Sequence, residues 1–316
     1  LGRNQAFCLQ LGNRMLKAGF KNFELMVFCS DGFDGSTDVS GAFINEAMYS
    51  SEEDKEFAEK CLENGFAVFA HDLRGHGKTK AEDAPLGCFG ISNGLSLVLE
   101  DQNCVIEFAK QKFPGAPIIC FGHSLGAIIA LNYTFMHPTK VSGLACWNRP
   151  ESKLLAKLSQ GILHTEKLFR GSAHPSLVAW KLSYGAWNSQ FKPNRTVADW
   201  ISQDNAEVDK YVADPLCGFD VSISMWLDVL KGAFKSGNIN YLTRLPKSLP
   251  IHTLCGSDDP CTNYGKDSRS FEKKLLKAGI KDFSCEILDD TRHESLNEWN
   301  REQTTERFFT WLRKRF

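Results

Sequence analysis

Ser124 stands at the centre of residues 122–126, which read Gly-His-Ser-Leu-Gly and match the Gly-x-Ser-x-Gly pattern of an activated serine. An apolar stretch with strand character, residues 117–121, precedes the motif, and a good helix-forming stretch, residues 127–133, follows it. A serine on a sharp turn between a strand and a helix has a strained backbone, which the small flanking glycines permit. The pattern therefore predicts a nucleophile elbow that exposes the Ser124 hydroxyl and turns the backbone N–H of Leu125 toward the attacked atom.

A serine hydroxyl needs a general base, and the base needs an acid that orients it. Residues 250–256 read as a buried strand, and Asp258 and Asp259 lie in the loop that follows. Residues 283–288 read as another strand, and His293 lies in the loop after it. Catalytic groups of open α/β sheets gather at the carboxyl ends of strands. We therefore expect the serine, one of the two aspartates and the histidine to meet there, in the chain order Ser, Asp, His.

The elements that must position these groups follow from the alternation of apolar strand-like stretches with amphipathic helical stretches. This alternation predicts an α/β protein with a mostly parallel, doubly wound sheet. The predicted strands cover residues 23–29, 41–44, 66–72, 117–121, 141–147, 250–256 and 283–288. The predicted helices cover residues 55–64, 92–113 and 125–137, and a further helix starts near Ser295.

The alternation breaks between about residues 149 and 240, where amphipathic pieces and tryptophans gather. We interpret residues 149–240 as a helical lid inserted into a core made of residues 1–148 and 241–316. Most of the lid aromatics are expected to anchor the lid, and a minority to line an acyl pocket, because substrate sites are mostly apolar with a few polar groups. The tryptophans of this stretch are Trp180, Trp187, Trp200 and Trp226.

Composition limits the classes of partner and compartment. The chain has 316 residues, 42% of them hydrophobic, and a formal net charge of −1, which argues against nucleic acid as a partner. No stretch is apolar over the roughly 18 residues that cross a bilayer. Eleven cysteines without metal-ligand spacing suggest reduced thiols in a cytoplasm, and no metal site is expected. Because Leu1 is not a start methionine, secretion stays open, and so does the oligomeric state.

Residues 66–79 closely resemble a signature of α/β-hydrolases of the monoacylglycerol lipase and lysophospholipase type, a group also labelled serine aminopeptidase-like. Residues 122–126 match its elbow, residues 293–298 match its histidine segment, and residues 256–259 match its Gly-x-x-Asp, which selects Asp259 over Asp258. The resemblance covers roughly residues 45 to 316. It implies the α/β-hydrolase fold with an inserted lid, and a catalytic triad of Ser124, Asp259 and His293 that uses no metal or organic cofactor.

The family also carries a His-Gly pair whose following residue donates the second oxyanion N–H. No such pair precedes residue 76 here. Counting without gaps places residues 45–46 at its position and makes Ala47 the donor, beside Leu125 of the elbow. The rival is Phe33, which follows residues 31–32 and requires an insertion of fourteen residues, the offset between positions 31 and 45. We prefer Ala47, because residues 50–54 then cap the helix that follows.

The expected function is that of a serine hydrolase that cleaves carboxylic esters through an acyl-enzyme. The resemblance points to lipid monoesters, a monoacylglycerol or a lysophospholipid, or to small esters, with transient membrane contact. One alternative is an aminopeptidase of the same fold, which needs an acidic pocket for a free amine, with Glu46 as a candidate. Another is a binding protein that keeps the fold without turnover, which the altered oxyanion loop favours and the intact triad opposes.

Overall fold

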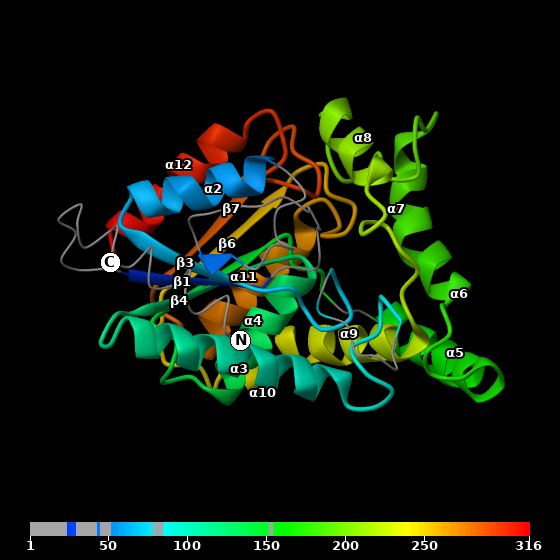
Figure 1. The fold of residues 1–316 in the computed structure, drawn as a ribbon, viewed down its shortest axis with the longest axis horizontal. Coiled ribbons are helices and arrows are strands. Elements are labelled where there is room, and N and C mark those ends of the chain that lie inside the picture. Colours follow the sequence, from blue (N-terminus) through cyan, green and yellow to red (C-terminus); the bar gives the residue numbers. More distant parts are fainter. Residues whose placement is uncertain (1–23, 30–42, 45–51, 78, 80–84, 152–153) are drawn as a thin grey trace.

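The computed structural model describes residues 24–29, 43–44, 52–77, 79, 85–151 and 154–316, and its strands form one seven-stranded sheet (Figure 1). The order across the sheet is β2-β3-β1-β4-β5-β6-β7, and every neighbouring pair is parallel, so the predicted parallel α/β sheet is confirmed. The strands are β1 (Glu24–Cys29), β2 (Phe43–Ile44), β3 (Phe66–Ala70), β4 (Ile118–His123), β5 (Gly143–Trp147), β6 (Ile251–Gly256) and β7 (Phe283–Leu288).

The strands β3, β4 and β5 are buried on both faces, which explains why they are largely apolar runs rather than alternating ones. Strand β3 illustrates this, because Ala67 and Phe69 belong to the hydrophobic core on one face, and Phe66 and Val68 belong to the core on the other. The helices that cover the faces are α2 (Glu52–Glu63), α3 (Gly94–Lys112), α4 (Leu125–Met136), α11 (Lys266–Ala278) and α12 (Arg301–Arg313).

Helices α2 and α12 cover one face, and α3, α4 and α11 cover the other, which makes the sheet doubly wound as predicted (Figure 1). On the first face the ring of Phe57 from α2 lies 5.6 Å from that of Phe121 on β4. The ring of Phe308 from α12 lies 5.2 Å from that of Trp147 on β5. Aromatic side chains bury large areas, so this layer fixes β4, which leads into the elbow, and its neighbour β5.

The predicted helix near Ser295 was wrong, because α12 begins only at Arg301. Residues 294–300 form turns, and several of their polar side chains bind other segments of the chain. The Ser295 hydroxyl donates to the side-chain oxygen of Asn148, and the Glu298 carboxylate accepts backbone N–H groups from Arg292 and residue 203. These long-range hydrogen bonds outweigh the local helical tendency of the sequence.

The segment between β5 and β6 contains no strand of the sheet among its described residues and folds mainly into helices on the right of Figure 1. Helix α9 packs against α3 and α4, and the side-chain amide of Asn132 on α4 donates to the carbonyl of Gly232 on α9 at 3.0 Å. The helices are α5 (Leu154–Arg170), α6 (Leu177–Trp180), η2 (Lys181–Gly185), α7 (Ala186–Asn188), η3 (Ser189–Phe191), α8 (Asn205–Ala213), α9 (Ile223–Ser236) and α10 (Ile239–Leu242).

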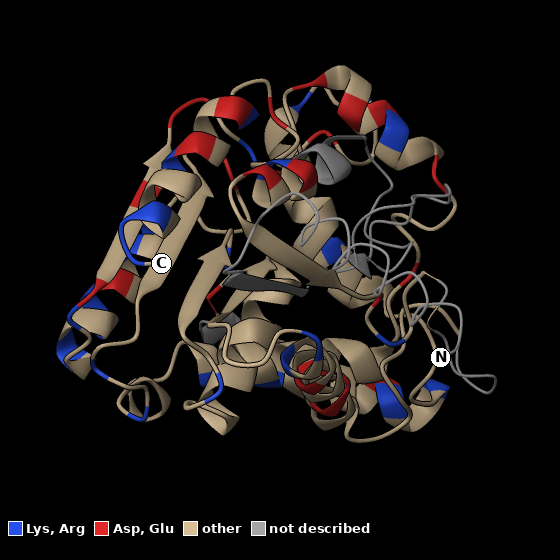
Figure 2. Ribbon diagram, turned by 60° about the vertical axis from the view of Figure 1, so that its left-hand side comes forward, with Lys and Arg blue, Asp and Glu red and all other residues tan. Residues whose placement is uncertain are grey.

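Charged residues of both signs are interspersed along the outer helices, while the central strands are largely uncharged (Figure 2). This distribution agrees with the formal net charge of −1. Among the described residues, no helix combines the length and the apolar composition needed to cross a bilayer.

Candidate active site

Ser124 lies on the sharp turn between β4 and α4, with φ 50° and ψ −113°. A residue with a side chain rarely adopts a positive φ, so the turn stores backbone strain. The turn is tight enough to require glycine before the serine, because a Cβ on Gly122 would lie 2.2 Å from the carbonyl oxygen of Gly126. The strand, the turn and the helix thus have the geometry that presents a serine hydroxyl above the sheet.

The structure brings Ser124, His293 and Asp259 into one hydrogen-bonded line. His293 Nε2 lies 2.9 Å from Ser124 Oγ, and His293 Nδ1 lies 3.0 Å from Asp259 Oδ2. The rival carboxylate, Asp258, is outside this line and lies near the side chain of Gln203 instead. The arrangement allows the imidazole to take the serine proton while the carboxylate holds the ring.

Asp259 is fully buried, and its ionised form is stabilised from several sides. Burial by itself raises the pKa of this carboxyl, but the charge on His293 and the hydrogen bonds from His293, Asn148 and Cys261 hold the pKa below its usual value. The backbone N–H of Cys261 donates to Oδ1 at 2.8 Å, and the side-chain amide of Asn148 donates to Oδ2 at 3.0 Å. Asp259 therefore stays ionised and can stabilise a protonated His293.

Asn148 was missed by the sequence analysis. It follows β5 directly, is buried, and has a φ of 48°, a conformation that asparagine tolerates better than most residues. The Ser295 hydroxyl donates to its Oδ1 at 2.8 Å, which fixes the amide so that its Nδ2 faces Asp259. The available signal was its position, since a polar residue at the carboxyl end of β5 lies beside β6, which carries the aspartate.

A cap segment, residues 199–203, is bound to the loop that carries His293. The backbone N–H of Glu294 donates to the carbonyl of Ile201 at 2.7 Å. The guanidinium of Arg292 donates to the carbonyls of Asp199 and Ser202, and the Trp200 ring lies 4.8 Å from the His293 ring. These contacts fix the imidazole relative to residues 199–203.

Glu298 also takes part in the contact between residues 199–203 and the loop that carries His293. Its carboxylate accepts the backbone N–H of Arg292 at 2.8 Å and that of Gln203 at 3.1 Å, so it joins the histidine loop to the cap segment. Burial raises the pKa of this carboxyl to about 7, although the hydrogen bonds and Arg292 act in the opposite direction. Glu298 therefore changes protonation near neutral pH.

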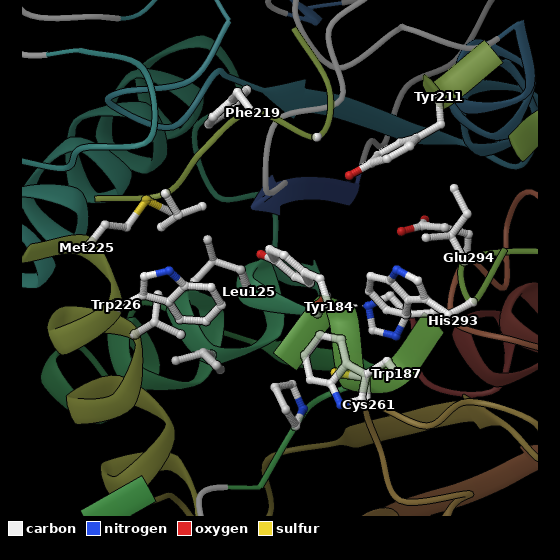
Figure 3. Close-up of a pocket in the computed structure, with 18 of the residues that line it drawn as sticks. Leu125, Tyr184, Trp187, Tyr211, Phe219, Met225, Trp226, Cys261, His293 and Glu294 are labelled. Atoms are coloured by element: carbon white, nitrogen blue, oxygen red, sulfur yellow. Dashed lines mark hydrogen bonds between the residues drawn. The ribbon is translucent and has the colours of Figure 1, made fainter. Parts of the chain in front are cut away.

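A pocket opens beside Ser124 and His293, between the sheet edge and the cap (Figure 3). Three of the four tryptophans of residues 149–240 line it, namely Trp187, Trp200 and Trp226, so the expectation that only a minority of them would face the pocket was wrong. The aromatic side chains pack on one another and face the cavity at the same time, with the Tyr184 ring 5.5 Å from both the Trp187 and Trp226 rings. The result is a largely aromatic and aliphatic cavity with the Ser124 hydroxyl at its wall.

Leu125 is the first residue of α4 and lines this pocket, so its backbone N–H lies beside the serine. Ala47 and Phe33 both lie outside the described residues, but the strands that precede them are described. Strand β1, before Phe33, is the direct neighbour of β4, with Cys29 opposite Gly122. Strand β2, before Ala47, is separated from β4 by β3 and β1, a distance of three strand spacings or about 14 Å.

Metal-ligating side chains among the described residues gather only around the triad histidine. His123 and Glu294 form one group with His293, and Asp259 and Cys261 form another with it. The two ring nitrogens of His293 already contact the serine and the aspartate, so neither group is a metal centre separate from the triad.

Comparison with known proteins gives a consistent set of relatives. The family described as serine aminopeptidase, S33, matches residues 48–300. The human monoglyceride lipase is 25% identical over 206 residues, which cover 63% of this chain and 56% of that protein. A monoglyceride lipase homolog of Monkeypox virus is 26% identical over 197 residues, covering 62% of this chain and 59% of that protein. The chain thus matches less than two thirds of the length of either relative.

Solved structures with the same arrangement of elements are more distant in sequence. A thermostable carboxyl esterase from Bacillus coagulans, in complex with glycerol, has a TM-score of 0.80 and 22% identity, over 93% of this chain and 91% of that chain. A soluble variant of the Saccharomyces cerevisiae monoglyceride lipase has a TM-score of 0.67 and 19% identity, over 94% and 88%. At 22% and 19% identity, the similarity to these two structures shows a shared fold and nothing further.

Proposed function

Because the chain belongs to the serine aminopeptidase S33 family and has the α/β-hydrolase fold, we propose that it is a serine hydrolase of carboxylic esters. One observation carries the proposal, the continuous hydrogen-bonded line from Ser124 through His293 to Asp259. The relatives named monoglyceride lipase support lipid monoesters as the substrate class, with small esters as the wider class. The largely apolar pocket beside the serine supports an acyl chain as the bound group.

The reaction proceeds in two steps. His293 Nε2 takes the Ser124 proton as Oγ attacks the ester carbonyl, and the charged imidazole is stabilised by Asp259. The tetrahedral intermediate collapses when His293 protonates the leaving alcohol, which leaves an acyl-enzyme on Ser124. A water molecule, deprotonated by His293, then releases the acid and restores the serine.

Two backbone N–H groups bind the oxyanion in this mechanism. Leu125, at the start of α4, supplies the first. For the second we propose Phe33 rather than Ala47, since the strand before Phe33 lies next to β4 and the strand before Ala47 lies about 14 Å away. A well-aimed donor is worth roughly 100- to 1,000-fold in rate, so this choice matters for activity.

The proposed architecture has a core of residues 1–148 and 241–316 and a cap of residues 149–240 over the pocket. The position of residues 149–240 between β5 and β6 supports this division, and so do the cap residues that line the pocket, Trp187 and Trp226 among them. The packing of α9 on α3 and α4 means that this part of the cap is attached firmly to the core.

Transient membrane contact is part of the proposal. Large apolar side chains are exposed on α5, with Leu168 and Phe169 at 84% and 85% exposure. The other exposed ones on α5, α6 and η2 are Ile162, Leu177, Val178 and Leu182, and Ile162, Phe169 and Val178 line one shallow groove. Wild-type protein should sediment with phosphatidylcholine vesicles, and Phe169→Asp should weaken this several-fold, whereas Ile91→Asp, at an exposed position outside the cap, should not. Equal sedimentation of all three would refute the contact.

The eleven cysteines support a reducing, cytoplasmic location for this activity.

The test of the function is hydrolysis of p-nitrophenyl esters from acetyl to palmitoyl, together with monoacylglycerols. Ser124→Ala should lower the rate by roughly a thousand-fold or more, as expected for loss of a triad member. Absence of turnover on every chain length, with no labelling of Ser124 by a fluorophosphonate, would instead support a catalytically silent binding protein. Faster cleavage of aminoacyl anilides than of esters would support the aminopeptidase that the family description names.

A further inference from the structure

The acyl half of the pocket is the part that lies away from His293 (Figure 3). Because the imidazole protonates the leaving alcohol, the alcohol occupies the space beside His293 and the acyl chain extends in the opposite direction. Met225 and Trp226 of α9 gather on that opposite side with Leu125 of α4. The acyl chain therefore lies between α4 and α9.

The acyl half ends where α4 and α9 come into direct contact. Ile128 of α4 and Val229 of α9 line the pocket. One turn further along each helix, the side-chain amide of Asn132 donates to the carbonyl of Gly232 at 3.0 Å. A Cβ on Gly232 would lie only 2.7 Å from the side chain of Ile128 and 3.5 Å from that of Leu95 on α3. Ile128 therefore rests against the backbone of α9, and the two helices close the pocket behind it.

This closed end is part of the protein core. Ile128 is 1% exposed and Met225 is 3% exposed, and Met225 packs in the same buried cluster as Leu95. Helix α9 contacts both α3 and α4. A longer chain could enter only by separating these packed helices, and close-packed interiors resist such a change. The closed end is therefore a rigid limit on chain length.

The volume of the pocket sets the scale of this limit. The whole cavity measures about 130 Å³. An apolar protein cavity of about 150 Å³ holds one benzene molecule, a ligand of about six carbons. Since the reacting carbonyl and part of the alcohol must share the space, the acyl chain that fits has at most about six carbons.

We propose that the acyl half of the pocket selects short acyl chains of about four to six carbons, so that the preferred substrates are small esters and short-chain monoacylglycerols. Ile128 and Val229 are the specificity-determining residues, because they form the closed end. This inference rests on the proposed function, because it assigns the acyl group of the same ester hydrolysis.

A series of p-nitrophenyl esters from acetyl to dodecanoyl isolates the acyl chain, because the leaving group is constant. Each ester is kept below its critical micelle concentration. Wild-type kcat/KM should rise about fourfold for each added CH₂ up to butanoyl or hexanoyl, the gain from burying one methylene. It should be at least about tenfold lower for decanoyl than at the optimum. An optimum at decanoyl or longer would overturn the inference and leave the ester hydrolase intact.

Substitutions at the closed end should move the optimum. Ile128→Ala and Val229→Ala enlarge the acyl half, so each should raise kcat/KM for the decanoyl ester relative to the butanoyl ester by about tenfold or more. Val229→Leu narrows it and should shift the optimum toward acetyl. Val212→Ala, the same truncation at an exposed position of α8 outside the described pocket lining, should keep the wild-type profile. Wild-type profiles in all three pocket variants would refute the role of Ile128 and Val229.

Binding separates this inference from the proposed function, because it needs no turnover. Ethyl decanoate should bind the Ser124→Ala protein at most about twofold more tightly than ethyl hexanoate, since the additional methylenes find no space. Adding Ile128→Ala should raise this ratio to about tenfold or more, as read by calorimetry. Both results without hydrolysis of any ester would support the short acyl pocket and refute the hydrolase. A ratio of about tenfold in Ser124→Ala alone would refute the short acyl pocket.

Discussion

The side-chain amide of Asn148 donates to the Asp259 carboxylate at 3.0 Å, although 111 residues separate them in the chain. The two residues follow neighbouring strands, β5 and β6, and the Ser295 hydroxyl holds the amide in the donating orientation. Asn148 is thus a fourth residue that follows a strand, and it positions the acid that orients the base. Asn148 acts on the reaction through Asp259 and is a positioning residue.

Asn148→Asp should lower kcat by about 10- to 100-fold and change KM little, because it removes a hydrogen bond to a charged group and places a second carboxylate against Asp259. The acidic limb of the kcat profile should also move to higher pH, since the pKa of the paired carboxyls rises. Steady-state kinetics on a p-nitrophenyl ester between pH 5 and 9 would show both effects.

Ser295→Ala is the milder companion, because it leaves the amide of Asn148 present but less firmly oriented. Its kcat should lie between those of wild type and Asn148→Asp. Unchanged kcat and pH profile in Asn148→Asp, with the protein folded by circular dichroism, would contradict a positioning role.

Glu298 should make stability fall as the pH rises toward neutrality. Burial raises the pKa of its carboxyl from 4.5 to about 7, so between these values the folded protein keeps a proton that the unfolded chain has released. This contribution to folding is complete below the unfolded pKa and is lost as the pH rises through the folded one. The wild-type Tm should therefore carry a downward component between about pH 4.5 and 7 that is absent from Glu298→Gln. Parallel Tm curves for the two proteins would rule out this titration.

Two glycine substitutions should have opposite effects on stability. Gly122→Ala places a Cβ 2.2 Å from the carbonyl oxygen of Gly126 and should cost about 3 kcal/mol or more, with loss of activity. Gly161→Ala, in helix α5, meets nothing within 4 Å and should stabilise by about 0.5–1 kcal/mol. Urea unfolding monitored by fluorescence would measure both. Equal effects would show that the elbow is looser than its geometry implies.

Arg292→Lys should loosen the cap segment, because lysine lacks the planar group that spans the carbonyls of Asp199 and Ser202 and stacks on Phe191. Hydrogen exchange of residues 199–203 should become faster, and kcat should fall several-fold as the histidine loop loses its support. Exchange at α3, on the far side of the sheet, serves as the internal control. Unchanged protection of residues 199–203 would show that other contacts suffice.

Local patterns in the sequence were sufficient to predict the strands and the three residues that the structure brings into line. Strand β7 has the predicted bounds, and Ser124, Asp259 and His293 each lie just after a strand. Such positions can be predicted because a strand, a turn and a polar residue are contiguous in the chain. The parallel sheet then brings these three positions to one edge.

The features that were missed depend on contacts between distant segments. Asn148 is an ordinary turn residue until β5 and β6 are placed side by side. The start of α12 was displaced because residues 295 and 298 bind Asn148 and the cap rather than their own helix. The choice between Ala47 and Phe33 stays a prediction, because both residues lie outside the described part of the chain.

The contact between residues 199–203 and the histidine loop has a consequence for how this protein can be altered. The carbonyls of Asp199, Ile201 and Ser202 hold the backbone and side chains on either side of His293. A chimera with the cap of another hydrolase would remove these acceptors and misplace the imidazole, unless residues 199–203 of this chain were retained. Sequence change in residues 199–203 and in the last loop of the core must therefore be concerted, and the pocket can be redesigned most safely from α9, which supplies Met225, Trp226 and Val229 to its wall.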